Sequence, residues 1–192
     1  MEVEKQKMCV KDQWCDAEKR LSVGTCWLKD QWEGARELTP QSAAIVGDFT
    51  ILWNYFESRF LALPENGRET KEGLKKLAEI LTGVSQQEGW NFFRRRYIDY
   101  TTGCETEEFK GLFGKSDRQE DEEDECRNKL RNTSPDIYYL LLIVYRIRNN
   151  LFHGNKPTHT LNDQAETIRH ASKVLMSVMS SVPTSALVER SN

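Results

Sequence analysis

Residues 134–156 read SPDIYYLLLIVYRIRNNLFHGNK and combine a long apolar stretch with a group of polar side chains at its end. Apolar residues in this stretch recur at spacings of three, four and seven, which indicates one buried face of a helix. These residues are Ile137, Leu140, Leu141, Val144 and Leu151. Ser134 suits the N-cap, Pro135 the first turn and Gly154 the left-handed end of a helix. The sequence therefore predicts a helix over residues 134–154.

Four other segments show helical periodicity, over residues 41–63, 69–81, 85–100 and 162–182. The first has Thr39 as its expected N-cap and Pro40 in its first turn. The four apolar faces contain Ile45, Phe49, Leu52, Trp53, Phe56 and Phe60; Leu74, Leu77, Ile80 and Leu81; Trp90, Phe93, Tyr97 and Tyr100; and Ile168, Ala171, Leu175 and Val178. No segment shows strand alternation of comparable quality. The fold class expected is all-α, a bundle of about four or five main helices.

With 192 residues the chain is long enough for one domain with a substantial core. We expect an N-terminal extension of uncertain structure over residues 1–40, one helical domain over 41–182 and a tail over 183–192. Residues 101–133 are interpreted as a connecting loop, because they contain three glycines and the acidic run DRQEDEEDE at 117–125. Such a run is usually solvated and self-repelling, although it could also mimic RNA or bind a partner.

The formal net charge is -3, which argues mildly against a nucleic-acid partner. The run at 117–125 alone carries -6, however, so the rest of the chain carries +3 and a local positive site is allowed. No apolar run approaches the roughly 20 residues that cross a bilayer, and the N-terminus is charged from its second residue. The five cysteines form no CxxC pair, so free thiols in a reducing compartment are expected. We therefore expect a cytoplasmic protein without a membrane partner.

The polar group at the end of the main helix, YRIRNNLFHGNK at 145–156, suits RNA cleavage without a metal ion. A histidine such as His153 can take or give the proton that the reaction moves, because it titrates near neutral pH. An arginine such as Arg148 can pair with phosphate oxygens through its planar fork of N–H donors. An asparagine such as Asn149 can orient the other groups or donate to the phosphate.

The pattern Arg148-Asn149-x-x-x-His153, followed by Gly154 and Lys156, resembles the R-x4-6-H motif of HEPN domains. It is most similar to the RNxxxH form found in bacterial toxin and defence ribonucleases, whose members often carry a W…FE-like stretch such as that at 53–60. The resemblance implies a HEPN-like bundle, a homodimer with a composite site, no cofactor, and cleavage that leaves a 2′,3′-cyclic phosphate. It also implies that Arg148 holds the phosphate, His153 is the general acid or base, and Asn149 orients them.

Helical geometry constrains this site. Arg148 and His153 are five residues apart, so on a straight helix their side chains point about 140° apart. Either the helix ends near Phe152, or two chains share the site. Glu57, Asn150 and Lys156 are candidates for supporting roles.

The arginines at 94–96, namely Arg94, Arg95 and Arg96, are candidates for RNA binding, although such a run more often marks a solvated face. Arg148 itself falls on the apolar stripe of its helix. A buried ion pair with Glu57 or Asp136 is the structural alternative for it.

The sequence is compatible with three functions. The first is a metal-independent endoribonuclease in a toxin–antitoxin or anti-phage system, with an RNA substrate and an antitoxin or regulatory protein as a further partner. The second is a non-catalytic HEPN-like module for dimerisation, nucleotide binding or RNA binding. The third, a metal-dependent hydrolase, fits less well because metal ions need clustered carboxylates or histidines at set spacings. The one dense carboxylate run is of low complexity.

Overall fold

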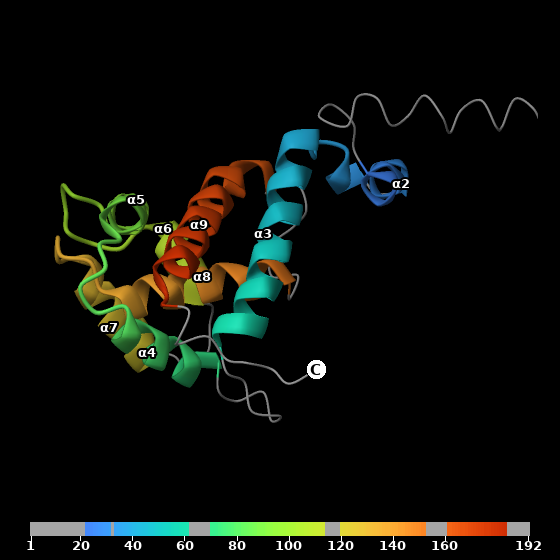
Figure 1. The fold of residues 1–192 in the computed structure, drawn as a ribbon. Coiled ribbons are helices and arrows are strands. Elements are labelled where there is room, and N and C mark those ends of the chain that lie inside the picture. Colours follow the sequence, from blue (N-terminus) through green and yellow to red (C-terminus); the bar gives the residue numbers. More distant parts are fainter. Residues whose placement is uncertain (1–21, 32, 62–69, 114–119, 153–160, 184–192) are drawn as a thin grey trace, which may run out of the picture.

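The computed structural model describes residues 22–31, 33–61, 70–113, 120–152 and 161–183 (Figure 1). These residues form α-helices and one short 3-10 helix, in the following order: α2 (Val23–Gln31), η2 (Glu33–Ala35), α3 (Pro40–Phe60), α4 (Thr70–Ile80), α5 (Gln87–Tyr97), α6 (Glu107–Phe113), α7 (Glu120–Leu130), α8 (Ile137–Phe152) and α9 (Leu161–Ser181). Within them the only β-type pairing is an isolated bridge between Ile98 and Glu105. The all-α expectation is confirmed, with more helices than the four or five expected.

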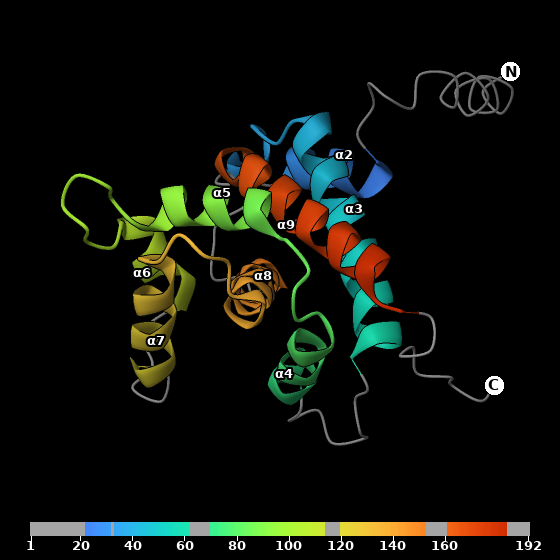
Figure 2. The ribbon, with the colours of Figure 1, turned by 60° about the vertical axis from the view of Figure 1, so that its left-hand side comes forward.

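The long helices α3 and α9 lie side by side and run in the same direction (Figures 1 and 2). Their starts are joined because Asn162 accepts a hydrogen bond from the Thr39 amide at 3.2 Å and donates to the Glu37 carbonyl at 2.6 Å. Thr39 is the N-cap of α3, as expected, and its hydroxyl accepts from the Ser42 amide at 3.0 Å. This pair forms one wall of the bundle.

Helix α8 runs through the middle of the bundle and is seen nearly end-on in Figure 2, between α4, α5, α7 and α9. Every residue from Tyr139 to Val144 is buried, so the helix is apolar all round rather than on one stripe. A helix of this kind belongs in the core and not at the surface. The cluster of buried side chains that contains it draws on α3 to α9.

The start of α8 differs from the expected one. Asp136, not Ser134, caps it: the Asp136 carboxylate accepts from the Tyr139 amide at 3.4 Å and its carbonyl accepts from the Leu140 amide at 3.0 Å. The chain just before it is held on α5, because the carbonyl of Asn132 accepts from Trp90 Nε1 at 3.1 Å. This bond holds the preceding chain outside the helix, so α8 is capped by Asp136, and aspartate is as good an N-cap as serine.

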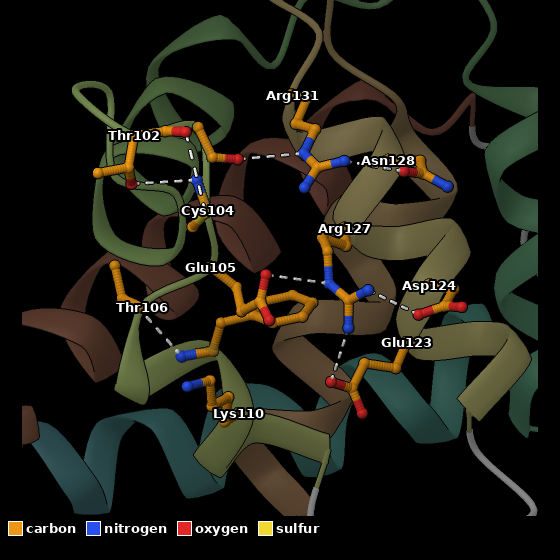
Figure 3. Close-up of polar contacts among 12 residues, drawn as sticks. Thr102, Cys104, Glu105, Thr106, Lys110, Glu123, Asp124, Arg127, Asn128 and Arg131 are labelled. Carbon is orange, nitrogen blue, oxygen red and sulfur yellow. Dashed lines mark hydrogen bonds and ion pairs between the residues drawn. The ribbon is translucent and has the colours of Figure 1, made fainter.

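The prediction of an acidic loop over 101–133 was wrong. The described part of this region forms α6 and α7, and its buried side chains are Phe109, Leu112, Phe113, Cys126 and Leu130. Figure 3 shows three carboxylates around the guanidinium of Arg127. Its Nε lies 3.5 Å from Glu105 Oε2, its Nη2 lies 3.2 Å from Glu123 Oε1, and its Nη1 lies 2.7 Å from Asp124 Oδ1. Basic partners inside the same region neutralise the carboxylates, so the chain is not forced into a self-repelling coil.

Smaller corrections concern the edges of the predicted helices. Ile80 and Tyr100 were placed on buried faces but are 48% and 54% exposed. The expected N-terminal extension contains α2, none of whose residues is buried. The expected helix end at Gly154 and the tail beyond residue 183 lie outside the described residues. Among the described residues, no helix is both long and apolar enough to cross a membrane.

Gly89 provides a test of how closely α5 packs against α9. A Cβ at this position would lie 2.6 Å from Val174 Cγ2, closer than real Cβ contacts. We expect Gly89→Ala to lower the free energy of unfolding by about 1–3 kcal/mol through overpacking, measured by urea denaturation. Gly47→Ala is the matched control, because no atom lies within 4 Å there; it should be stabilising by about 0.5–1 kcal/mol, as expected for an exposed helix interior. A neutral Gly89→Ala variant would contradict the close packing.

Candidate functional site

Arg148 lies one turn before the end of α8, and its side chain reaches toward Glu57 of α3. Its guanidinium carbon lies near two aromatic rings, 5.8 Å from the centroid of the Trp53 ring and 5.2 Å from that of Phe152. Trp53 is buried on α3, whereas Phe152 is 46% exposed. Both rings lie within the distance at which an aromatic ring attracts a cation.

The polar contacts of Arg148 leave part of its donor capacity unused. Its Nη1 donates to Asn149 Oδ1 at 3.2 Å, and its Nη2 lies 3.9 Å from Glu57 Oε2, which is ion-pair distance but too long for a hydrogen bond. The same Glu57 oxygen accepts from Trp53 Nε1 at 3.2 Å. Arg148 Nε is buried and has no hydrogen-bond partner among the described residues. The guanidinium is therefore positioned firmly but bonded incompletely.

About a quarter of each charged side chain in this pair remains exposed, 26% for Arg148 and 23% for Glu57. A guanidinium in such a position is partly desolvated but still reachable from solvent. Partial desolvation strengthens its attraction for an anion. Glu57 would compete with that anion for the guanidinium, but its contact at 3.9 Å is too long for a hydrogen bond, so a phosphate that bonds in fork geometry could displace it.

The structure brings together three of the residues singled out from the sequence: Arg148, Asn149 and Glu57. Asn150 points elsewhere, because its Nδ2 donates to the carbonyls of Gly111 at 3.2 Å and Leu112 at 3.0 Å and so joins α8 to α6. His153 and Lys156 follow α8 directly in the chain but lie outside the described residues. The proposed acid–base partner of Arg148 thus remains a sequence prediction.

Of the two alternatives for an ion pair with Arg148, the structure favours Glu57. Asp136 lies at the other end of α8 and pairs with Lys129 at 3.0 Å. The sequence missed Trp53 and Phe152 as neighbours of the guanidinium. A signal for Phe152 was available, because it is four residues after Arg148 on the same helix and such pairs are adjacent.

The three arginines of α5 do not form one basic surface. Arg94 is engaged at the end of α7, where its Nε donates to the Leu130 carbonyl at 3.1 Å, its Nη2 donates to the Arg131 carbonyl at 3.4 Å, and its guanidinium stacks on Tyr100. Arg96 is partly buried beside Tyr97, and only Arg95 is exposed. A structural role therefore accounts for Arg94, and Arg95 is the member best placed for RNA binding.

A second arginine of α8, Arg146, is more deeply buried than Arg148 and was not singled out from the sequence. It is 7% exposed, forms an ion pair with Glu122 of α7, and lies over the Phe113 ring at 5.1 Å. Glu122 also pairs with Lys71 of α4 at 2.7 Å. Burial opposes the charge on Glu122, but bonds from Lys71 and Arg146 outweigh it and hold the pKa of this carboxyl below its ordinary value. This group joins three helices and is structural.

The histidine and the free thiols among the described residues are weaker candidates for a functional site than Arg148. His170 stacks on Phe92 with ring centroids 3.6 Å apart, and burial lowers its pKa. Cys26, Cys104 and Cys126 are free thiols. In the part of the chain that the structure describes, no group of three or more His, Cys, Asp or Glu side chains is arranged to hold a metal ion.

Comparison with known proteins adds no family to this site. The chain matches no protein-family model, no curated protein and no solved structure.

Proposed function

We propose that this protein is a metal-independent endoribonuclease and that Arg148 holds the phosphate at the cleaved bond. One observation carries the proposal. Arg148 is three-quarters buried near two aromatic rings, has a buried Nε without a partner among the described residues, and lies five residues before a histidine. Burying a charged side chain without all of its hydrogen bonds is unfavourable, which suggests that Arg148 binds an anionic ligand.

The reaction would need three groups from this segment. His153 would take the proton of the ribose 2′-hydroxyl while the 2′-oxygen forms a bond to phosphorus. Arg148 would stabilise the charge that builds on the phosphate oxygens, and Asn149 would keep the guanidinium in place through its bond to Nη1. The bond to the 5′-oxygen would then break, with a proton from water or a second histidine. The products would be a 2′,3′-cyclic phosphate and a 5′-hydroxyl.

Glu57 would act through Arg148 in this scheme and not on the RNA. It holds the guanidinium from the side of α3, 3.9 Å from Nη2, and is itself fixed by Trp53. The resemblance to HEPN ribonucleases adds a homodimer with two motif copies at one site, in a toxin–antitoxin or anti-phage setting, controlled by an antitoxin or another regulatory protein. These partners belong to the proposal as well.

Cleavage of RNA by the full chain in EDTA tests the function. We expect the wild-type protein to leave 2′,3′-cyclic phosphate ends, and we expect His153→Ala to reduce cleavage by about 10²- to 10⁴-fold through loss of the acid–base group. The matched control is His170→Ala, which removes the histidine stacked on Phe92 and should leave cleavage unchanged. Undiminished cleavage by His153→Ala, with circular dichroism showing an intact fold, would contradict the assignment.

A non-catalytic module is the second candidate, and one observation favours it. The ion pair with Glu57 and the two aromatic rings give Arg148 neighbours that need no RNA to explain them. Expression in a bacterial host separates the two candidates. An active ribonuclease should slow growth and Arg148→Ala should relieve this, whereas a binding module should give equal growth with both proteins.

A further inference from the structure

The hydroxyl group of Thr167 on α9 is buried and has no hydrogen-bond partner among the described residues. The residue is only 5% exposed. Serine and threonine in a helix commonly donate to the carbonyl three or four residues earlier. Ser172, which is also buried on α9, does so, because its Oγ donates to the Ile168 carbonyl at 3.1 Å. Thr167 makes no such bond, and a buried hydroxyl without a hydrogen bond is unfavourable.

Thr167 lines a small cavity where α5, α6, α8 and α9 meet, with a volume of about 20 Å³. Helix α9 contributes Gln164 and Thr167 to its wall, and α8 contributes Ile147 and Asn150. The two residues of each pair are three positions apart, so they lie on the same side of their helix. The cavity therefore receives polar side chains from two helices that face each other.

The size and the charge of the cavity select its ligand. A buried water molecule needs about 10–15 Å³ of such space, so this cavity holds one water molecule and excludes larger ligands. Its wall carries one base, Arg96 of α5, and one acid, Glu108 of α6, so their formal charges cancel. A neutral ligand is therefore favoured over an ion.

We propose that one water molecule is bound in this cavity, hydrogen-bonded to Thr167 Oγ1 and to the side-chain amides of Asn150 and Gln164. Amide groups can donate and accept, and a buried water typically makes about three hydrogen bonds. The water joins the last turn of α8 to α9. Asn150 already joins the same turn to α6, because its Nδ2 donates to the carbonyls of Gly111 and Leu112.

This site is separate from the candidate cleavage site. Asn150 is two residues after Arg148 on α8, so the two side chains point about 160° apart around the helix. The water therefore lies on the other side of α8 from the guanidinium. The inference goes beyond the proposed function, and it can be tested without measuring RNA cleavage.

The direction of the stability change in Thr167→Val tests the proposal in the full chain. Valine has nearly the same shape as threonine but lacks the hydroxyl. With the water in place, valine removes one of its hydrogen bonds, and the midpoint of urea denaturation should fall by about 0.5 M. If the hydroxyl has no partner, valine removes an unfavourable buried polar group, and the midpoint should stay the same or rise.

A crystal structure of the wild-type protein supplies the second measurement, and it should show density for one water molecule about 2.5–3.0 Å from Thr167 Oγ1. The matched control is Thr50→Val, because the Thr50 hydroxyl donates to the Val46 carbonyl at 2.8 Å, a type of bond that adds little to helix stability. Its urea midpoint should change by less than about 0.2 M. Circular dichroism should show both variants folded. A wild-type map without this density would overturn the proposal, as would a midpoint of Thr167→Val that does not fall.

Discussion

Replacing Arg148 by lysine is expected to lower the rate of RNA cleavage by about 10²- to 10³-fold, although the positive charge is kept. Lysine offers a point charge in place of a planar fork, and its ammonium group cannot reproduce the contacts of the guanidinium with the rings of Trp53 and Phe152. It would also lose the bond to Asn149 Oδ1 that fixes the guanidinium. The measurement is a single-turnover cleavage rate at saturating protein, which separates the chemical step from RNA affinity.

Two comparisons make this prediction specific. Arg95→Lys changes an exposed arginine on α5 in the same way and should leave the single-turnover rate unchanged. Because the pair with Glu57 is partly exposed and long, Arg148→Lys should change the free energy of unfolding by no more than about 1 kcal/mol. A cleavage rate in Arg148→Lys equal to that of the wild type would show that the guanidinium of Arg148 has a structural role and no role in cleavage. A large loss of stability would show that the rate measures folding instead.

The main helices of the bundle were predictable because single-residue signals and hydrophobic periodicity agree there. Thr39 and Pro40 begin α3 as expected, and the inward residues predicted for α9, from Ile168 to Val178, are all buried. The start of α8 was not predictable in detail. Ser134 and Asp136 are both good caps, and bonds from α5 to the preceding chain select the second one.

The candidate site was predictable only in part. The sequence offered Glu57 or Asp136 as the partner of Arg148, because an arginine on an apolar stripe needs an acidic partner, and the structure favours Glu57. It did not indicate that Trp53 lies near the guanidinium, since this depends on how α3 crosses the end of α8. It also placed only Arg148 against apolar surroundings, whereas α8 is buried on all sides and Arg146 is the more enclosed of the two.

The composition of the acidic run at 117–125 predicts a loop, whereas its described part, from residue 120 on, belongs to α7. A dense row of carboxylates favours a solvated coil only when no basic partners are near. In the fold, Arg127 of the same helix, Arg146 of α8 and Lys71 of α4 pair with this segment, and the last two are far away in sequence. A single sequence gives no indication of such distant partners, so the helical state of α7 depended on tertiary contacts that could not be seen.

Glu122 provides the most sensitive test of this helix. Its carboxylate is 17% exposed and is shared between Arg146, whose side chain is 8% exposed, and Lys71. Glu122→Ala should lower the free energy of unfolding by about 3–5 kcal/mol, because it leaves the buried Arg146 guanidinium without its counter-ion. Urea denaturation followed by tryptophan fluorescence measures the change, since Trp53 and Trp90 are buried reporters. Asp124→Ala, two residues later, is the control: its side chain is 63% exposed and the loss should stay below about 1 kcal/mol.

The pH dependence and a double variant show whether the effect arises from the ion pair. The pKa of Glu122 is lowered in the folded protein, so its contribution is full above its ordinary pKa of 4.5 and is lost as the pH falls through the folded value. The difference between wild type and Glu122→Ala should therefore shrink in acid. Removing both charges in Glu122→Leu/Arg146→Met should recover most of the loss, because no buried charge is then left unpaired. Equal, small losses for Glu122→Ala and Asp124→Ala would mean that this stretch is the solvated loop its composition suggests, and that α8 does not depend on it.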